Sequence, residues 1–262
     1  MKAIVFAAGL GTRLGAFTKE HPKALVEIGG VPMLERVLLK LRAAGIEEVV
    51  VNVHHFAGQI IDFLESRGNL GMRIHVSHES ELLLETGGGI LAAARYLCGD
   101  EPVLVHNSDI LTDFPIAEMA ACHKSSEAEA TLLVAERDTS RYLLLDDAME
   151  MQGWTNIATG DVRPDAEARE RGTLRRAFGG VHVVSPSMFG SLKQYNDMLV
   201  SKGAEADSRG LCRFSIMNFY IDTCRDSLFK GFEPSAPYLW CDIGKPESVE
   251  RAQKMICGLR DS

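Results

Sequence analysis

The chain has 262 residues, 46% of them hydrophobic, and a formal net charge of −8 at pH 7. A chain of this length can bury a sizeable core, so we expect one α/β domain over residues 1–262. The acidic balance argues against general nucleic-acid binding, which needs a basic surface that releases counterions from phosphates.

The cysteines and the distribution of apolar residues indicate the compartment. The six cysteines form no C-x-x-C pair and have no regular spacing, which is typical of reduced thiols rather than of a disulfide or zinc framework. The chain does not start with a basic segment followed by an apolar run, and no apolar stretch reaches 18 residues. We therefore expect a cytoplasmic protein with no membrane contact, present as a monomer or a small homo-oligomer.

Strand and helix patterns alternate over residues 1–120. Short apolar runs predict strands at 2–8, 48–53, 73–77 and 102–106. Helical spacing of apolar residues predicts helices at 32–44, 57–66 and 88–97. This alternation favours right-handed crossovers and a Rossmann-like, mostly parallel twisted sheet with helices on both faces. In such sheets ligands bind beyond the carboxyl ends of the strands.

The second half, residues 121–262, is less regular. A polar and charged segment at 152–173 is rich in turn residues, and we interpret it as an excursion or hairpin that covers the cleft. Around it, the apolar patterns predict strands at 130–135, 142–145, 178–184 and 238–242, a helix at 214–224 and a closing helix at 246–259.

The first predicted strand opens into a glycine-rich turn, Gly9 to Arg13. Glycine has no Cβ, so backbone N–H groups in such a turn can approach a phosphate. Arg13 offers a planar fork of donors for phosphate oxygens, and the nearby Lys23 offers a point charge. The alternative is an ordinary tight turn with surface cations nearby.

Two well-known phosphate loops do not fit this turn. A P-loop has Gly-Lys-Ser/Thr after four intervening residues, whereas Gly11 is followed by Thr12 and Arg13. A dinucleotide fingerprint would need a glycine at position 14, which is Leu14, and strand 48–53 does not end on an acidic residue that could hold a ribose. The sequence therefore argues against a dinucleotide-dependent oxidoreductase.

Two aspartates lie at the ends of predicted strands from distant parts of the chain. Asp109 follows strand 102–106 in HNSDI, and Asp242 ends strand 238–242 in YLWCDIGKP. Mg²⁺ bound to a nucleotide takes one or two protein carboxylates and fills its other positions with phosphate oxygens and water. Either aspartate alone is more simply a cap of the following turn. Together with Arg13 and Lys23, the pair predicts a Mg²⁺ site over the phosphate loop.

The segment LLETGGGI, residues 83–90, places three glycines before a predicted helix. Consecutive glycines would let a flat ligand lie against bare backbone, with N–H groups of the helix start directed outward. The alternative is a flexible helix entry with Thr86 as its cap.

These residues resemble a known family. AAGLGTRL, HPKAL, LLETGGGI, HNSD and WCDIGKPES are similar to the successive signatures of the sugar-1-phosphate nucleotidyltransferases, from Met1 to about Leu259. The segment LLETGGGI and the compact length resemble most the N-acetylmuramate-1-phosphate uridylyltransferases, with mannose- and heptose-1-phosphate guanylyltransferases close behind. The resemblance implies the nucleotide-diphospho-sugar transferase fold, with a nucleotide-binding half at 1–120 and a sugar-binding half at 121–262.

The resemblance also implies roles for individual positions. Arg13, Lys23 and Asp109 would be the catalytic residues, and Asp109 and Asp242 would hold Mg²⁺. Residues 79–88 would contact the base, and Asn107 would lie by the sugar. The implied substrate-binding set is Ala8, Gly9, Gly11, Thr12, Arg13, Lys23, Glu81, Gly87, Gly88, Asn107 and Gly180.

The chain departs from the family at two places. It has Asn-Ser-Asp at 107–109 where relatives commonly have Asn-Gly-Asp. It also has no lysine between Lys124 and Lys193, where many relatives carry one for the sugar phosphate. Arg141, Arg175 and Arg176 are candidates to replace that lysine.

The reaction that we expect is attack of a sugar 1-phosphate oxygen on the α-phosphorus of a nucleoside triphosphate, with release of pyrophosphate. We expect UTP and an N-acetylmuramate 1-phosphate-like acceptor, with a GDP-sugar-forming enzyme as the alternative. Glu79 and Glu81 would favour guanine, since a carboxylate accepts hydrogen bonds. A regulatory protein that binds nucleotide-sugars without turnover is the alternative that is not an enzyme; both predicted metal carboxylates are present, which argues against it.

Overall fold

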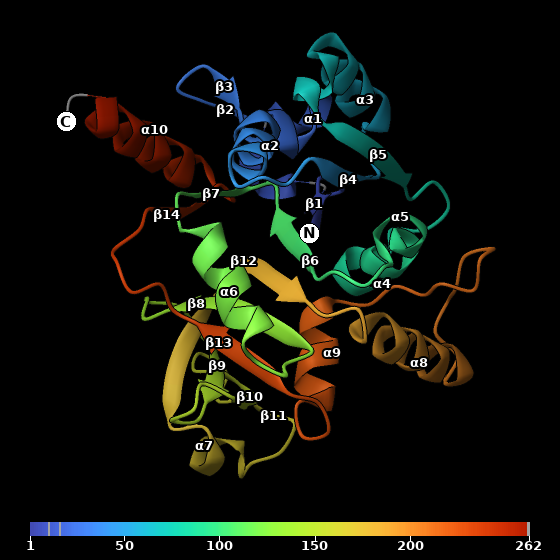
Figure 1. Ribbon diagram of the computed structural model, residues 1–262, viewed down its shortest axis with the longest axis vertical. Coiled ribbons are helices and arrows are strands. Elements are labelled where there is room, and N and C mark those ends of the chain that lie inside the picture. The colour runs from blue at the N-terminus through green and yellow to red at the C-terminus, as the bar shows by residue number, and fades with distance from the viewer. Residues whose placement is uncertain (10, 16, 261–262) are drawn as a thin grey trace.

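The computed structural model describes residues 1–9, 11–15 and 17–260. A ten-stranded sheet runs through the molecule in the order β11-β10-β9-β12-β6-β1-β4-β5, and β8 and β13 extend it from β12 (Figure 1). The prediction of an α/β fold with a mostly parallel central sheet is confirmed.

Four parallel strands from the first half form one side of this sheet. They are β1 (Lys2–Phe6), β4 (Glu48–Val53), β5 (Arg73–His78) and β6 (Val103–Asn107), within two residues of the predicted bounds. Phe6 is paired with Asn52 on one side and with Asn107 on the other. Because these strands are parallel, the three residues lie at one level at the carboxyl edge of the sheet.

Helices cover both faces of the parallel strands, as predicted. Side chains alternate along a strand, so Ile4 and Val50 face one way and Ala3 and Val49 the other. The first face packs against α4 (Glu85–Ala92), α5 (Ala94–Leu97), α8 (Met188–Ser201) and α9 (Ile216–Thr223). The second face packs against α2 (Met33–Ala43), α3 (Ala57–Ser66) and α6 (Ile116–Lys124).

The second half adds strands that are mostly antiparallel. The long strand β12 (Leu174–Val184) runs antiparallel to β6 and joins the two halves. The other strands that this half adds to the large sheet are β8 (Ala130–Ala135), β9 (Arg141–Leu145), β10 (Met151–Asn156), β11 (Val162–Arg163) and β13 (Phe229–Phe232).

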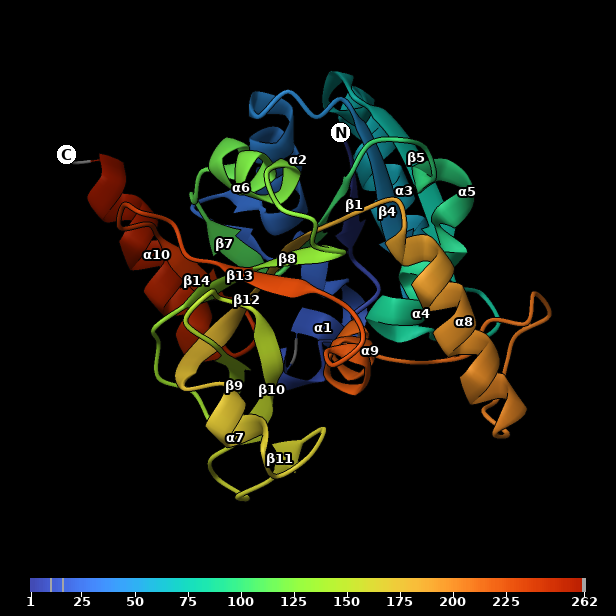
Figure 2. The same ribbon diagram turned by 60° about the horizontal axis from the view of Figure 1, so that its bottom comes forward.

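The polar segment at 152–173 forms a hairpin, as predicted. It contains β10, β11 and the short helix α7 (Ala168–Arg171), and lies at the end of the molecule opposite to α3 (Figures 1 and 2). Several elements were not predicted from the sequence, among them the helices α6 and α8 and the strand β13. The predicted helix at 88–97 begins earlier, at Glu85, and is divided at Ala93 into α4 and α5.

Two small sheets and the last helix complete the described chain. The strands β7 (Ile110–Thr112) and β14 (Trp240–Asp242) pair antiparallel, as do β2 (Glu27–Ile28) and β3 (Val31–Pro32). The closing helix α10 (Pro246–Arg260) packs on β14 and β2, close to its predicted bounds. Short helices lie at Thr12–Leu14 (η1), Phe17–Glu20 (α1), Lys23–Leu25 (η2) and Gly68–Gly71 (η3).

Within the described ranges, none of the helices has the length and apolar character needed to cross a membrane.

Candidate functional site

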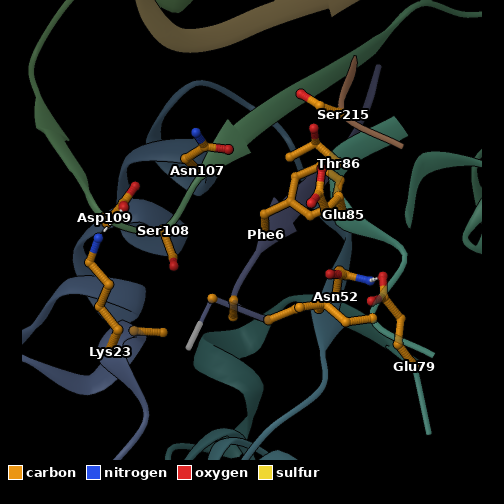
Figure 3. Close-up of a pocket in the computed structure, with 15 residues that line it drawn as sticks. Phe6, Lys23, Asn52, Glu79, Glu85, Thr86, Asn107, Ser108, Asp109 and Ser215 are labelled. Atoms are coloured by element: carbon orange, nitrogen blue, oxygen red, sulfur yellow. Dashed lines mark hydrogen bonds and ion pairs between the residues drawn. The ribbon is translucent and has the colours of Figure 1, made fainter. Parts of the chain in front are cut away.

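A cavity of about 340 Å³, which we call the first cavity, lies over the carboxyl ends of β1, β4 and β6. Figure 3 shows a charged pair, Lys23 and Asp109, at one end and a second polar pair, Asn52 and Glu79, at the other, with Phe6 between them. The other lining residues are Ala7, Ala8, Gly9, Ala24, Leu83, Glu85, Thr86, Asn107, Ser108 and Ser215. The cavity therefore lies where ligands bind in parallel α/β sheets.

The glycine-rich turn folds back on the segment that follows it. Gly11 has a φ of +63°, and a Cβ built there would lie 2.7 Å from Cγ2 of Thr18, so only glycine fits. The Thr18 hydroxyl donates a hydrogen bond to the carbonyl of Gly11 at 2.9 Å. Ala8 and Gly9 line the first cavity, and Thr12 is exposed in η1. The predicted turn residue Leu10 lies outside the described residues.

Lys23 and Asp109 form an ion pair in which both side chains are largely shielded, with 11% and 26% of their surfaces exposed. Pro22 precedes η2, and its extended conformation starts this short helix with Lys23 at its first position. The two residues come from segments 86 positions apart, so the fold brings together two groups that the sequence predicted to act together.

Asp242 lies beside Asp109 because β14 pairs with β7. The Ile243 N–H donates to the carbonyl of Asp109 at 2.8 Å, and Asp242 is in register with Ile110. Within the described chain, Oδ1 of Asp242 is buried and has no hydrogen-bond partner. Burial raises the pKa of Asp242, and the negative charge of Asp109 raises it further, while Lys23 and two arginines oppose these effects.

The two aspartates fit the donor set that Mg²⁺ prefers. Mg²⁺ binds to one or two carboxylates, and a buried carboxylate oxygen without a partner is costly unless a cation or a donor reaches it. Asp242 has such an oxygen, and its charge is destabilised by the charge of Asp109. A divalent cation held by these carboxylates would remove both costs.

A second and larger cavity of about 800 Å³ adjoins the first, and the two cavities share Asn107 and Asp109. Gly180, with a φ of +75°, lies in its wall beside the side chains of Asn107 and Ile110. Although the protein is acidic overall, five basic side chains and three acidic ones from the described chain line this cavity. They are Arg13, Arg137, Arg141, Lys245 and Arg251 against Asp109, Asp138 and Asp242.

Arg137 is a residue of this cavity that the sequence did not predict. Its guanidinium lies 3.3 Å from the centre of the Trp240 ring, and its Nη2 donates to the carbonyl of Phe178 at 2.9 Å. Its Nη1 is buried and lacks a hydrogen-bond partner among the described residues. Burial lowers the pKa of Arg137 from its usual range. No sequence motif marks this arginine, since it lies in the irregular segment between β8 and β9.

Of the three arginines considered as replacements for the missing lysine, the structure brings one to the second cavity. Arg141 lines it. Arg176 instead forms an ion pair with Glu233 at 2.9 Å, and Arg175 is exposed outside the lining. Arg13 also reaches this cavity, where it lies close to Gly244 and Asp242.

The structure corrects the expectation that bare glycine backbone faces a ligand. Gly87 and Gly88 are buried, their N–H groups donate to the Phe214 carbonyl at 3.0 and 3.4 Å, and a Cβ on Gly87 would lie 2.2 Å from the Phe214 ring. The glycines therefore allow close packing of α4. Thr86 does not cap this helix, because its hydroxyl accepts from the N–H of Ile216 at 2.9 Å.

The two glutamates considered as base contacts lie in different surroundings. Glu81 is exposed, accepts two hydrogen bonds from Ser208 at 2.9 and 2.7 Å, and is not part of the cavity lining. Glu79 is 1% exposed and lines the first cavity. Burial raises the pKa of Glu79, although its hydrogen bonds oppose this shift. Its partner Asn52 was not predicted from the sequence, because its role depends on the pairing of β4 with β5.

Comparisons with known proteins agree with this geometry. The profile of the family described as MobA-like NTP transferase domain matches residues 3–195. The N-acetylmuramate alpha-1-phosphate uridylyltransferase of Caulobacter vibrioides is 31% identical over 97% of this chain and 96% of that protein. Mannose-1-phosphate guanylyltransferase 1 of Arabidopsis thaliana is 31% identical over 74% of this chain and 52% of that protein.

The chain spans only part of the length of the plant guanylyltransferases that it matches. For the three rice proteins this share is 64%. Among solved structures, apo UDP-glucose pyrophosphorylase superposes with a TM-score of 0.75 at 16% identity, over 99% of both chains. At this identity the superposition shows a shared fold.

Proposed function

The chain belongs to the MobA-like NTP transferase family, and from this premise we propose that it transfers a nucleotidyl group from a nucleoside triphosphate to a sugar 1-phosphate, with release of pyrophosphate. The observation that carries the proposal is the pair of cavities that meet at Asn107 and Asp109. A donor in the first cavity and an acceptor in the second would bring their phosphates together at the Asp109–Asp242 pair.

Positioning and charge neutralisation are the work of the protein in this reaction. The second pKa of a phosphate monoester is about 6, so at pH 7 the attacking oxygen is already ionised and needs no general base. Lys23 lines the first cavity and Arg13 the second. In this proposal Lys23 would bind phosphate oxygens of the donor. Holding two reactants in line lowers the barrier by removing the entropy cost of their encounter.

Asp109 and Asp242 would hold Mg²⁺ in this proposal, which rests on the unpartnered oxygen of Asp242. When bound, the ion would neutralise charge on the phosphates of the donor. Lys23 is paired with Asp109 and lines the first cavity, where its ammonium group would also donate to a donor phosphate.

We propose UTP as the donor and an acidic amino-sugar 1-phosphate, like N-acetylmuramate 1-phosphate, as the acceptor. The similarity to the Caulobacter uridylyltransferase extends over nearly the whole of both proteins. The second cavity, with its excess of basic side chains, suits an acceptor that carries a carboxylate in addition to its phosphate. Formation of a GDP-sugar is the second candidate, favoured by the plant guanylyltransferases among the relatives.

The test is pyrophosphate release by the purified protein with each of the four common nucleoside triphosphates and a panel of sugar 1-phosphates. We expect turnover with UTP and an acceptor that carries a carboxylate. Turnover with GTP and mannose or heptose 1-phosphate would replace the uridylyltransferase assignment with the guanylyltransferase one. Tight nucleotide-sugar binding without pyrophosphate release for any pair would contradict the transferase proposal.

A further inference from the structure

A buried amide–carboxylate pair closes the end of the first cavity that is farther from Lys23 (Figure 3). Asn52 is fully buried and Glu79 is 1% exposed. The Asn52 Nδ2 donates to Oε1 of Glu79 at 2.8 Å, and the backbone N–H of Leu84 donates to Oε2 at 2.8 Å. Both carboxylate oxygens of Glu79 therefore act as acceptors.

This arrangement fixes the orientation of the Asn52 amide. An ionised carboxylate has no proton to give, so the group that faces it must be a donor. The NH₂ of Asn52 must then point to Glu79, and its carbonyl oxygen must point the other way. Figure 3 shows the amide nitrogen toward Glu79 and the oxygen on the side of the cavity interior.

The Asn52 oxygen is the unsatisfied member of the pair. Within the described chain, Oδ1 of Asn52 is buried and has no hydrogen-bond partner. A buried acceptor left without a donor is costly, and native structures seldom keep one without a reason. Asn52 is also in register with Phe6, and both residues line the first cavity. In Figure 3 the Asn52 oxygen lies on the side of Phe6, away from Glu79.

We propose that Asn52 selects the base of the nucleotide by accepting a hydrogen bond from a ring N–H, and that Glu79 acts as the positioning residue that keeps the amide in this orientation. This inference rests on the proposed function and deepens it. Uracil and guanine carry such an N–H at N3 and N1, whereas cytosine and adenine have a bare acceptor nitrogen at the corresponding positions. The named relatives transfer uridylyl and guanylyl groups, and both of these bases meet this requirement.

The first experiment compares kcat/KM for UTP, GTP, CTP and ATP with one acceptor. We expect kcat/KM for UTP to exceed that for CTP, whose base has the same size, on the order of a thousandfold. With CTP, the Asn52 oxygen and N3 of cytosine would face each other as two acceptors, and neither would have a donor. If CTP were used within about tenfold of UTP, the role of Asn52 would be refuted while the transferase proposal would stand.

The second experiment changes the orientation of the amide. In Glu79→Gln the new side chain can present either its NH₂ or its oxygen, so Asn52 can turn its own NH₂ to the base. We expect the UTP/CTP ratio to fall by about tenfold or more, with kcat/KM for CTP unchanged or higher. If Glu79 had only a structural role, the substitution would lower kcat/KM for all four nucleoside triphosphates by the same factor. This result would contradict the inference.

A matched control and a second variant protect this test. Glu48→Gln makes the same change at the other end of β4, where Glu48 pairs with Lys2 and Arg73, away from both cavities, and should leave the ratio unchanged. If Glu79→Gln does not fold, Asn52→Ala removes the acceptor itself and should abolish the preference for UTP over CTP.

If the wild type releases no pyrophosphate with any donor, the proposed function fails. The dissociation constants of UTP and CTP, measured by calorimetry, then test Asn52 alone: equal affinities would refute its role.

Discussion

At the scale of single residues, the candidate site contains polar atoms that the fold leaves without a partner. Oδ1 of Asp242, Oδ1 of Asn52 and Nη1 of Arg137 are buried without hydrogen bonds in the described chain. Each is costly in the free protein and would be satisfied by a different part of the proposed substrates: a cation, a base and an anionic group.

Asp109→Asn and Asp242→Asn should each lower kcat/KM on the order of a hundredfold or more, because each removes charge from the proposed cation site. The fold should persist, since both side chains lie at strand ends and the backbone bond from Ile243 to Asp109 remains. The measurement is activity as a function of Mg²⁺ concentration, with thermal unfolding of each variant as the control. Normal turnover of both variants at limiting Mg²⁺ would show that the metal assignment is wrong.

Arg137→Met should raise KM for the acceptor by about tenfold or more, because a charge-assisted hydrogen bond is lost. KM for the donor should change little, since Arg137 lines the second cavity and not the first. Arg95→Met removes an exposed arginine that contacts Tyr96 and serves as the matched control. An equal increase of both KM values in Arg137→Met would argue against an acceptor contact.

At the scale of elements, the glycines of LLETGGGI act through packing. The α4 helix lies so close to the segment at 212–214 that Gly87 and Gly88 leave no room for a Cβ. This contact positions Leu83, Glu85 and Thr86 at the first cavity, because these residues lie at the start of the same helix or just before it. The motif therefore affects the site indirectly, by fixing a helix.

Gly87→Ala should lower the free energy of unfolding by about 2 kcal/mol, since the added methyl would overlap the ring of Phe214. Gly99→Ala is the matched control, because nothing lies within 4 Å of a Cβ at that position. Urea-induced unfolding of both variants measures the difference. A Gly87→Ala protein as stable as the control would show that α4 can move away from Phe214 without cost.

At the scale of the whole molecule, the two halves meet along β6 and β12, and this junction contains two buried histidines. His106 on β6 and His182 on β12 are fully buried, and burial lowers their pKa values to about 4 and about 3. Their ordinary pKa is 6.5, so the unfolded chain takes up these protons at a higher pH than the folded protein does. The contribution of both groups to stability is therefore complete above about pH 7 and is lost as the pH falls below 6.5.

The free energy of unfolding should fall by roughly 4 kcal/mol between pH 7 and pH 5 from this source. Urea unfolding at both pH values measures it. His182→Phe, which keeps a buried ring and removes the titrating group, should reduce the pH dependence by about half. An unchanged pH dependence in this variant would show that the histidine does not cause it.

The sequence by itself predicted much of the fold and several residues that line the candidate site. The parallel strands and their helices follow from local hydrophobic periodicity, which each segment contains in full. Lys23, Asp109 and Asp242 could be predicted because they belong to short sequence motifs. Asp109 follows β6, and the direction of this parallel strand places its last residues at the ligand edge. Lys23 lies in η2 and Asp242 ends the antiparallel strand β14, so their motifs alone marked them. The glycine-rich turn with Gly11 is similarly local, since its left-handed backbone conformation requires glycine.

Only the tertiary structure decided which other side chains join this site. Asn52 and Arg137 lie in segments without a motif, and their roles depend on Glu79 and Trp240, which are distant in the sequence. Gly87 packs against Phe214 and does not expose its backbone to a ligand, and Phe214 lies more than a hundred residues away in the sequence. Local sequence determines backbone conformation. The partners of a buried polar atom depend instead on how distant segments pack together, and no single segment encodes this packing.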